Sequence, residues 1–323
     1  MRKLMLTLIV LVLVAVATLA AMIAFGTGAA PPPMASLSDP YRNVDMSSLP
    51  APQSLTARDG VKLAYRYYPA ASATPERVVI LIHGATASSP SMHPLAARLA
   101  AQNMAVYALD MRGHGDSGRR GDLDYPGQLD DDLGEIVGLV KSRHAGTPLA
   151  LAGFSAGGGF SLHTAATPLG NSFERVVLLS PMLGPRAPTT KPDGSDRLVK
   201  PFVPRIIALV LLNRLGIQAF DHLQTLAFGD FGRPELTPNY SFVLMSGFAT
   251  ADYADDLRKA HAPLAVTVGT EDEFFAADRY TPTLDAVRPG IPVTVLPGLN
   301  HIEMITEASA VPAIVAALRG AER

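Results

Sequence analysis

The sequence of 323 residues contains no cysteine, and it lacks an excess of charge of either sign. Without cysteine sulfur there is no disulfide, thiolate metal site, cysteine nucleophile or acylated N-terminal cysteine. The 27 Lys and Arg residues stand against 29 Asp and Glu residues, and no basic run is interleaved with aromatics, which argues against a nucleic-acid partner. Apolar residues make up 48% of the chain, which supplies a sizeable core and excludes a wholly disordered protein.

The first long apolar run is at the N-terminus, where Arg2 and Lys3 precede Leu4 to Phe25. A helix of this length, about 33 Å at ~1.5 Å per residue, crosses a bilayer core of about 30 Å. We therefore expect residues 1–28 to form a single-pass anchor, with the remaining chain extracytoplasmic because Arg2 and Lys3 stay in the cytoplasm. The alternative is a signal peptide cut after Gly28-Ala29-Ala30, which would give a secreted or periplasmic protein.

Residues 29–52 are rich in proline and have little apolar periodicity. Proline fixes φ and lacks the backbone N–H, so this stretch predicts an extended linker rather than a packed element. The folded domain is expected to begin near Gln53.

From there on, short apolar runs alternate with longer amphipathic stretches. An antiparallel hairpin is predicted around Asp59-Gly60, since this dipeptide supports the positive φ of tight turns. Buried strands are predicted at Val78 to Ile82, Val106 to Leu109, Leu149 to Ala152, Val176 to Leu179, Leu264 to Val268 and Val293 to Leu296. Helices are predicted at Met92 to Gln102, Gln128 to Arg143, Gly157 to Ala166, Asp278 to Val287 and Ala308 to Arg319. This alternation indicates an α/β fold, a mostly parallel sheet with helices on both faces and ligands beyond the carboxyl ends of the strands.

One segment interrupts the alternation, between Val176 to Leu179 and Leu264 to Val268. It is far longer than a simple crossover needs, so it predicts an insertion that acts as a cap or lid. We place the cap at 183–251 and the core at 53–182 and 252–323. Its apolar run Ile206 to Leu212 and its phenylalanines indicate an acyl pocket or a bilayer contact, or a helix packed on its own domain. The phenylalanines are Phe202, Phe220, Phe228 and Phe231.

The motif Gly153-Phe154-Ser155-Ala156-Gly157 lies between a predicted strand and a predicted helix. In this context a Gly-x-Ser-x-Gly serine is held in a strained turn with its hydroxyl exposed, and a Cβ at either glycine would collide with neighbouring backbone. The other interpretation is a helix N-cap serine.

A serine nucleophile requires a base and an acid that orients it, and folds with this turn order them as Ser, acid, His. The loop Gly269 to Glu273 and the loop Gly298 to His301 follow neighbouring predicted strands. We predict His301 as the base and favour Asp272 over Glu271 and Glu273 as the acid, because a short side chain loses less rotamer freedom when fixed. The amides of Ala85 and Ala156 are assigned to an oxyanion hole, and His83 is expected to hold the loop at Ala85.

Together these motifs resemble the α/β-hydrolases, and more narrowly the monoacylglycerol lipase and lysophospholipase branch, also grouped as serine-aminopeptidase-like hydrolases. The segments that carry the resemblance are Val79 to Gly84, Leu109 to Ser117 with Arg120-Gly121, Gly153 to Gly158, Leu178 to Pro181, Gly269 to Asp272 and Gly298 to His301. It covers roughly Gln53 to Arg319.

The resemblance implies Ser155 as nucleophile, Asp272 as acid, His301 as base and the Ala85 and Ala156 amides as oxyanion donors. It also implies hydrolysis of lipid-like carboxylic esters through an acyl-enzyme, without a cofactor or a metal. Phe154 and Ala156 stand where such relatives often carry His and Met, and this difference leaves the substrate open.

Three alternatives remain at this point. One is a short-chain carboxylesterase, and another is an amidase or aminopeptidase with an acidic site in the cap for a substrate amine. The third is an inactive binding module, which would have no need of all three residues. The candidate acids for the second are Asp193, Asp196, Asp221 and Asp230.

Overall fold

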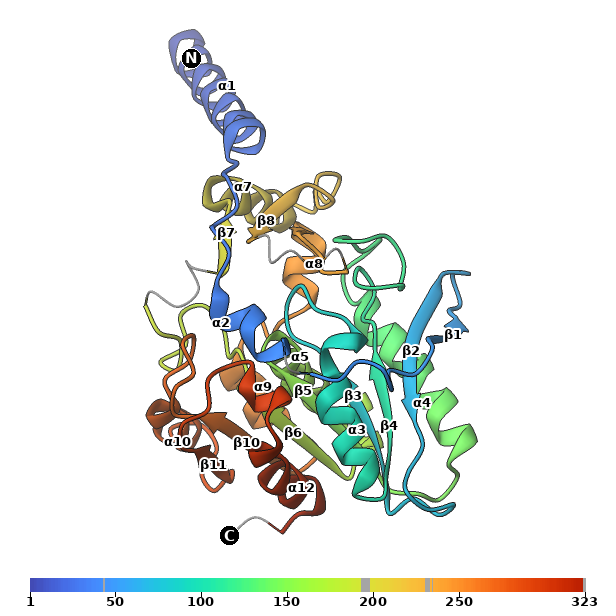
Figure 1. Cartoon of the computed structure of the whole chain (residues 1–323). Helices are drawn as coiled ribbons and strands as arrows, with labels where there is room; N and C mark the ends of the chain where they lie inside the picture. The colour runs from blue at the N-terminus through green and yellow to red at the C-terminus, as the bar shows by residue number, and fades with distance from the viewer. Residues whose placement is uncertain (43, 193–197, 230–232, 234, 322–323) are drawn as a thin grey trace.

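The computed structural model describes residues 1–42, 44–192, 198–229, 233 and 235–321, and its centre is one large sheet (Figure 1). The sheet has eight strands in the order β1-β2-β4-β3-β5-β6-β10-β11. The strands are β1 (Gln53–Thr56), β2 (Lys62–Tyr68), β3 (Arg77–Ile82), β4 (Met104–Leu109), β5 (Leu149–Phe154), β6 (Arg175–Leu179), β10 (Leu264–Gly269) and β11 (Val293–Leu296). Strands β1 and β2 run antiparallel and the others are parallel, which confirms the predicted sheet.

Helices cover both faces because successive strand residues point to opposite sides. On β3, Ile80 belongs to one buried apolar cluster and Leu81 to the other. The first cluster is closed by α4 (Gln128–Arg143), α5 (Ala156–Ala166) and α10 (Ala277–Asp285), and the second by α3 (His93–Ala101) and α12 (Val311–Arg319). The short helices are η2 (Ser89–Met92), η3 (Pro168–Ser172), α11 (Glu303–Thr306) and η4 (Ala308–Ala310).

The hairpin that opens the domain has the expected turn. Gly60 has φ of 84°, and the Ala57 N–H donates to the Val61 carbonyl at 2.8 Å. The positive φ of residue 60 explains why a glycine stands at this position.

The insertion between β6 and β10 holds a small sheet that the sequence pattern did not indicate. Its strands form the order β7-β8-β9, and most are too short to show a two-residue alternation. The elements are β7 (Val199–Pro201), α7 (Val203–Arg214), β8 (Gln224–Phe228), β9 (Asn239–Ser241), α8 (Phe242–Gly247) and α9 (Tyr253–Lys259). Phe202 and Phe228 are buried and Phe220 is exposed, while Phe231 lies outside the described residues.

The N-terminal helix α1 (Arg2–Phe25) projects from the body of the molecule (Figure 1). It has a mean hydropathy of 3.0 and none of its residues is buried, so it is long and apolar enough to cross a membrane or to act as a signal sequence. Its end touches the cap helix α7, where Nε of Arg205 donates to the Ile23 carbonyl at 2.8 Å.

The linker that follows differs from the expected extended chain. Residues Ala35–Ser38 form helix α2 and Asp39–Tyr41 form helix η1, and Leu37 and Tyr41 pack against the buried core. Pro40 is tolerated because the first positions of a helix need no N–H partner. The prediction rested on proline content and overlooked the apolar surface that Leu37 and Tyr41 can bury.

Helices α4, α5 and α9 meet at His163 on α5. Its ring nitrogens lie 3.6 Å from Asp130 on α4 and 3.6 Å from Asp256 on α9. The neighbouring carboxylates of Asp130 and Asp256 raise the pKa of His163 to about 10, against the opposing effect of burial. The folded protein therefore holds the proton more tightly than the unfolded chain, and this stabilisation is full below the ordinary histidine pKa of about 6.5.

We expect His163→Gln to lower the melting temperature at about pH 6 by roughly 2 to 4 °C, a small value because these ion pairs are partly solvated. The difference from the wild type should narrow as the pH rises from about 6.5 to about 10, where the histidine loses its proton. Thermal unfolding at several pH values measures this, and a difference independent of pH would contradict the assignment.

Candidate active site

Ser155 lies in a strained turn between the end of β5 and the start of α5. It has φ of 56° and ψ of −118°, a backbone conformation that costs a non-glycine residue on the order of 1–3 kcal/mol. Its N–H donates to the Leu179 carbonyl at 2.9 Å, and its carbonyl accepts from Gly158 at 3.0 Å and from Met182 at 2.9 Å. These bonds from a neighbouring strand and the following helix hold the turn in place.

The two motif glycines allow this turn to form. A Cβ on Gly153 would lie 2.2 Å from the Gly157 carbonyl oxygen, and a Cβ on Gly157 would lie 2.3 Å from the His83 carbonyl oxygen. Both distances are much shorter than a van der Waals contact, and the opposing atoms belong to the backbone, so they cannot move aside easily. The collision expected from the sequence motif is therefore present at both positions.

Asp272 and His301 meet at the carboxyl ends of β10 and β11. Oδ2 of Asp272 lies 2.7 Å from Nδ1 of His301, and both side chains are buried. Oδ1 of Asp272 accepts from the backbone N–H groups of Phe274 at 2.9 Å and Phe275 at 3.0 Å. The carboxylate is thereby fixed at both oxygens, and it orients the imidazole.

The two competing acids of this loop have other positions. Glu271 is exposed, and Oε2 of Glu273 accepts from the backbone N–H of His301 at 3.0 Å. Glu273 therefore positions the main chain of the histidine loop and does not contact the ring through this bond. The short side chain of Asp272 is the one that reaches the imidazole.

Burial by itself raises the pKa of Asp272, but the charge and hydrogen bond of His301 and the Phe274 and Phe275 amides outweigh it. The net effect is a pKa below the ordinary value of a carboxyl. Asp272 is therefore ionised at neutral pH. The stabilisation that this gives is present above the unfolded-state pKa and is lost as the pH falls through the lowered folded-state value.

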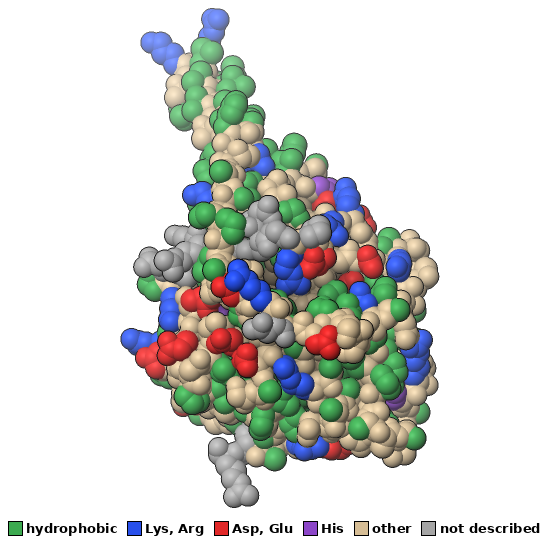
Figure 2. Space-filling model, viewed as in Figure 1, with side chains coloured by type: hydrophobic (Ala, Val, Ile, Leu, Met, Phe, Trp, Pro, Cys, Tyr) green, Lys and Arg blue, Asp and Glu red, His purple; other side chains and the backbone are tan. Residues whose placement is uncertain are grey.

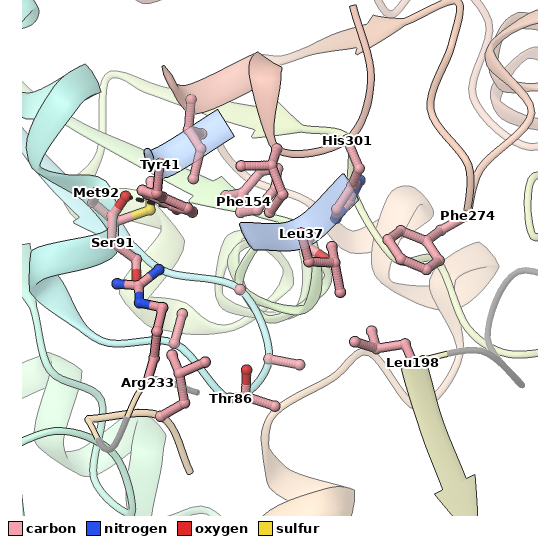
Figure 3. A pocket seen from close by; sticks show the side chains of 17 residues that line it. Leu37, Tyr41, Thr86, Ser91, Met92, Phe154, Leu198, Arg233, Phe274 and His301 are labelled. Atoms are coloured by element: carbon pink, nitrogen blue, oxygen red, sulfur yellow. Dashed lines mark hydrogen bonds between the residues drawn. The ribbon is translucent and has the colours of Figure 1, made fainter. Parts of the chain in front are cut away.

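Ser155 and His301 line one cavity of about 60 Å³ (Figure 3). Its wall is mostly apolar and comes from the core, the cap and the linker. The other lining residues are Leu37, Tyr41, Gly84, Ala85, Thr86, Ala87, Ser91, Met92, Phe154, Leu198, Arg233, Leu236, Phe274, Ile302 and Ile305.

Ala85 and Ala156 bring two backbone N–H groups to this part of the molecule. Ala85 follows β3 and lines the cavity, and Ala156 is the first residue of α5, where an N–H has no partner within the helix. Within the described part of the chain, neither N–H donates to another protein group. Both are available to a ligand oxygen.

The loop that carries Ala85 is fixed by the cap. Thr86 has φ of 64°, its N–H donates to the hydroxyl of Tyr240 at 2.8 Å, and its carbonyl accepts from Thr237 at 2.8 Å. The Tyr240 oxygen lies 2.5 Å from Nε2 of His114, whose Nδ1 lies 3.3 Å from the Arg112 carbonyl. Burial, and then the nearby His83, hold the pKa of His114 well below its ordinary value, so its neutral ring accepts the tyrosine proton.

Sequence reasoning missed Tyr240. It lies in the insertion, 126 positions from His114 along the chain, and no local motif marks it. The signal in the sequence was His114 itself, within the motif Leu109 to Ser117.

That motif supports the fold around the cavity. Asp110 accepts from the N–H groups of Ser89 at 2.6 Å and Asp116 at 3.0 Å, and Arg112 forms two bonds of 2.7 Å with Asp132. His83 accepts from the Met111 N–H at 3.1 Å and lies 2.8 Å from the Gly84 carbonyl. These contacts fit the expectation that His83 holds its loop.

Of the four acids considered for an amine site, only Asp221 is among the described residues, and it does not line the cavity. Asp221 accepts from Nδ2 of Asn213 at 2.7 Å within the cap, and Asp193, Asp196 and Asp230 lie outside the described residues. Among the residues that the structure describes, no three His, Asp or Glu side chains are grouped so that they could hold a metal ion.

Comparisons with known proteins agree with this architecture. Residues 73–308 match the family described as Hydrolase_4, serine aminopeptidase S33. The monoacylglycerol lipase of Mycolicibacterium smegmatis is 34% identical over 115 residues, which are 35% of this chain and 41% of that protein. The chain spans about half the length of the curated relatives it matches, between 41% and 55% for the first two.

Two solved structures are similar in fold. A soluble variant of monoglyceride lipase from Saccharomyces cerevisiae, in complex with a substrate analogue, matches with a TM-score of 0.66 and 17% identity over 88% of this chain and 99% of that one. A membrane phospholipase A described as a bacterial virulence factor matches with a TM-score of 0.59 and 18% identity over 99% of both chains. The match to residues 73–308 covers most of the sequence, and the chain therefore belongs to the serine aminopeptidase S33 family, with the fold of an α/β-hydrolase.

Proposed function

We propose that the protein is a membrane-anchored serine hydrolase that cleaves lipid-like carboxylic esters, of the monoacylglycerol or lysophospholipid type. The observation that carries this proposal is the Asp272–His301 pair, 2.7 Å apart, beside a cavity that Ser155 shares with His301. A base held by an ionised acid and a serine on a strained turn are the parts that nucleophilic acyl transfer requires.

In the proposed mechanism, the Ser155 hydroxyl attacks the ester carbonyl and His301 accepts its proton. Because Nδ1 of His301 is bonded to Asp272, Nε2 is the nitrogen left for this transfer. His301 then protonates the leaving alcohol, and water releases the acyl group from Ser155 by the reverse sequence. A histidine base has to be neutral, so activity falls in acid.

The negative oxygen of the tetrahedral intermediate is assigned to the N–H groups of Ala85 and Ala156. Both are backbone donors on rigid parts of the fold, one after β3 and one at the start of α5. Such donors are fixed before the reaction and typically contribute a factor of about 100 to 1000 each.

An ester substrate is favoured over an amine by the wall of the cavity. Its lining contains no acid in the described part of the chain that could pair with an ammonium group, and the Arg233 guanidinium there is already paired with Glu235 at 2.7 Å. The apolar lining suits an acyl chain. Two of the similar proteins are named as lipases of monoacylglycerols, also called monoglycerides.

Membrane attachment through α1 is part of the proposal. Helix α1 carries apolar side chains along its length and basic residues at its free end (Figure 2). The cap helix α7 lies next to the base of α1. It exposes Val203 (51% exposed), Ile207 (47%) and Leu211 (42%) at helical spacing, and Leu215 (72%) directly after the helix continues this apolar stripe. This stripe would face the bilayer surface that α1 enters.

The first test is labelling of the full-length protein with a fluorophosphonate probe, which reacts with activated serines. We expect the wild type to be labelled and Ser155→Ala to be unlabelled, with ester hydrolysis reduced by about 10⁴-fold or more. Ser161→Ala, on the same helix α5, is the matched control and should keep its labelling. A folded wild type that is not labelled would favour an inactive binding module.

The link between the cap and the oxyanion loop predicts a defect for Tyr240→Phe. Loss of the hydroxyl leaves the Thr86 N–H without its acceptor, so the neighbouring Ala85 donor is displaced. We expect kcat to fall about 10- to 100-fold with little change in KM.

The matched control is Tyr107→Phe. It removes another tyrosine–histidine hydrogen bond, in which the Tyr107 hydroxyl oxygen lies 2.9 Å from Nε2 of His144. Affinity for a boronic acid that mimics the oxyanion should fall only for Tyr240→Phe. Equal affinities in the two variants would mean that Tyr240 has a structural role alone.

Anchoring is tested by alkaline carbonate extraction of membranes that contain the full-length chain. We expect the protein to remain in the pellet, and the double variant Leu11→Arg, Val14→Arg to lose this retention, since each arginine costs about 3 kcal/mol at the centre of a spanning helix. A mature chain that begins at Pro31 and is extracted would identify α1 as a cleaved signal.

A further inference from the structure

The cavity that holds Ser155 and His301 is small for the substrates proposed above. Its volume of about 60 Å³ is far below the roughly 300 Å³ at which pockets for small organic ligands begin. A long acyl chain therefore needs space that side chains of the protein now occupy.

Two of those side chains come from the linker, outside the catalytic fold. Leu37 on α2 and Tyr41 on η1 line the cavity together with Ser155 and His301, and Figure 3 shows them among its walls. Leu37 also packs against both apolar clusters of the core. The segment Met34 to Tyr41, which we call the strap, thus brings the middle of the linker into the cavity wall.

The strap is attached to the core and to the cap. The Tyr41 hydroxyl donates to the Ser91 carbonyl at 3.0 Å, and the Arg233 guanidinium lies 4.5 Å above the Tyr41 ring. Burial raises the pKa of Tyr41 to about 12, against the opposing effect of Arg233, so the phenol stays a neutral donor across the working pH range. Both attachments involve residues that themselves line the cavity.

We propose that the strap determines the acyl-chain length that the enzyme accepts, with Leu37 and Tyr41 occupying the space into which a longer chain would extend. This inference rests on the proposed ester hydrolysis at Ser155. Short acyl chains bind with the strap in place, and each further methylene meets Leu37 or Tyr41. The strap lies after Ala30, so the inference holds whether α1 is retained or removed.

Replacing Leu37 by alanine opens the wall without touching the reacting groups. Each extra methylene that the opened space buries is worth about 0.8 kcal/mol, or roughly a fourfold gain in kcat/KM. The space of a leucine side chain admits a few methylenes, so the preference for long over short chains should rise at least about tenfold. Tyr41→Ala should act in the same direction, because it removes a larger side chain from the same wall.

The experiment measures kcat/KM of the full-length enzyme in detergent for nitrophenyl esters from butanoate to dodecanoate. The quantity compared is the ratio of dodecanoate to butanoate, in which a general loss of folded enzyme cancels. The control is Leu49→Ala, which changes a leucine of the same linker outside the cavity lining. This variant should keep the wild-type ratio.

A ratio that is unchanged or lower in both Leu37→Ala and Tyr41→Ala overturns the inference, provided that fluorophosphonate labelling shows an intact Ser155. Absence of labelling and hydrolysis in the wild type would instead overturn the proposed function. A ratio that rises equally in Leu49→Ala would also overturn the inference, because the effect would then not come from the cavity wall.

Discussion

The rest of the site depends on the strained backbone at Ser155. Its positive φ is unfavourable for a serine, and it persists because α5 packs so closely against β5 and the end of β3 that neither Gly153 nor Gly157 has room for a Cβ. The same closeness places the first N–H of α5 beside the loop after β3. One packing constraint therefore fixes the positions of the Ser155 hydroxyl and of the two amides assigned to the oxyanion. The order of the strands then places the His301 loop on the opposite side of Ser155 from the loop after β3.

The insertion completes this arrangement. Thr237 and Tyr240 bond both polar backbone groups of Thr86, next to Ala85, and Tyr240 is held in turn by the neutral ring of His114. A loop with a non-glycine residue at positive φ needs such support. In the proposed mechanism, the cap therefore acts on the chemistry through hydrogen bonds to this loop as well as through the shape of the pocket.

Sequence reasoning worked where a local pattern carries the physics. The strands are apolar runs of β length, and the turn at Ser155 follows from two glycines in fixed positions, so both were predictable. Asp272 was favoured over its two acidic neighbours for the short side chain that does reach His301. The β7-β8-β9 sheet, the role of Tyr240 and the packing of Leu37 depend on contacts between distant segments, and single-sequence periodicity does not record such contacts.

The linker shows how proline content can mislead about packing. Many prolines in a segment indicate an unpacked tether. Proline also restricts the unfolded chain, however, and so reduces the conformational entropy that is lost when the segment is fixed. The chain from Ile23 to Tyr41 is attached at both ends, by Arg205 at the Ile23 carbonyl and by Ser91 at the Tyr41 hydroxyl. A linker that only joined an anchor to a domain would have no need of two attachments. The stiffness that proline provides suits a segment that has to keep Leu37 and Tyr41 at a defined place in the cavity wall.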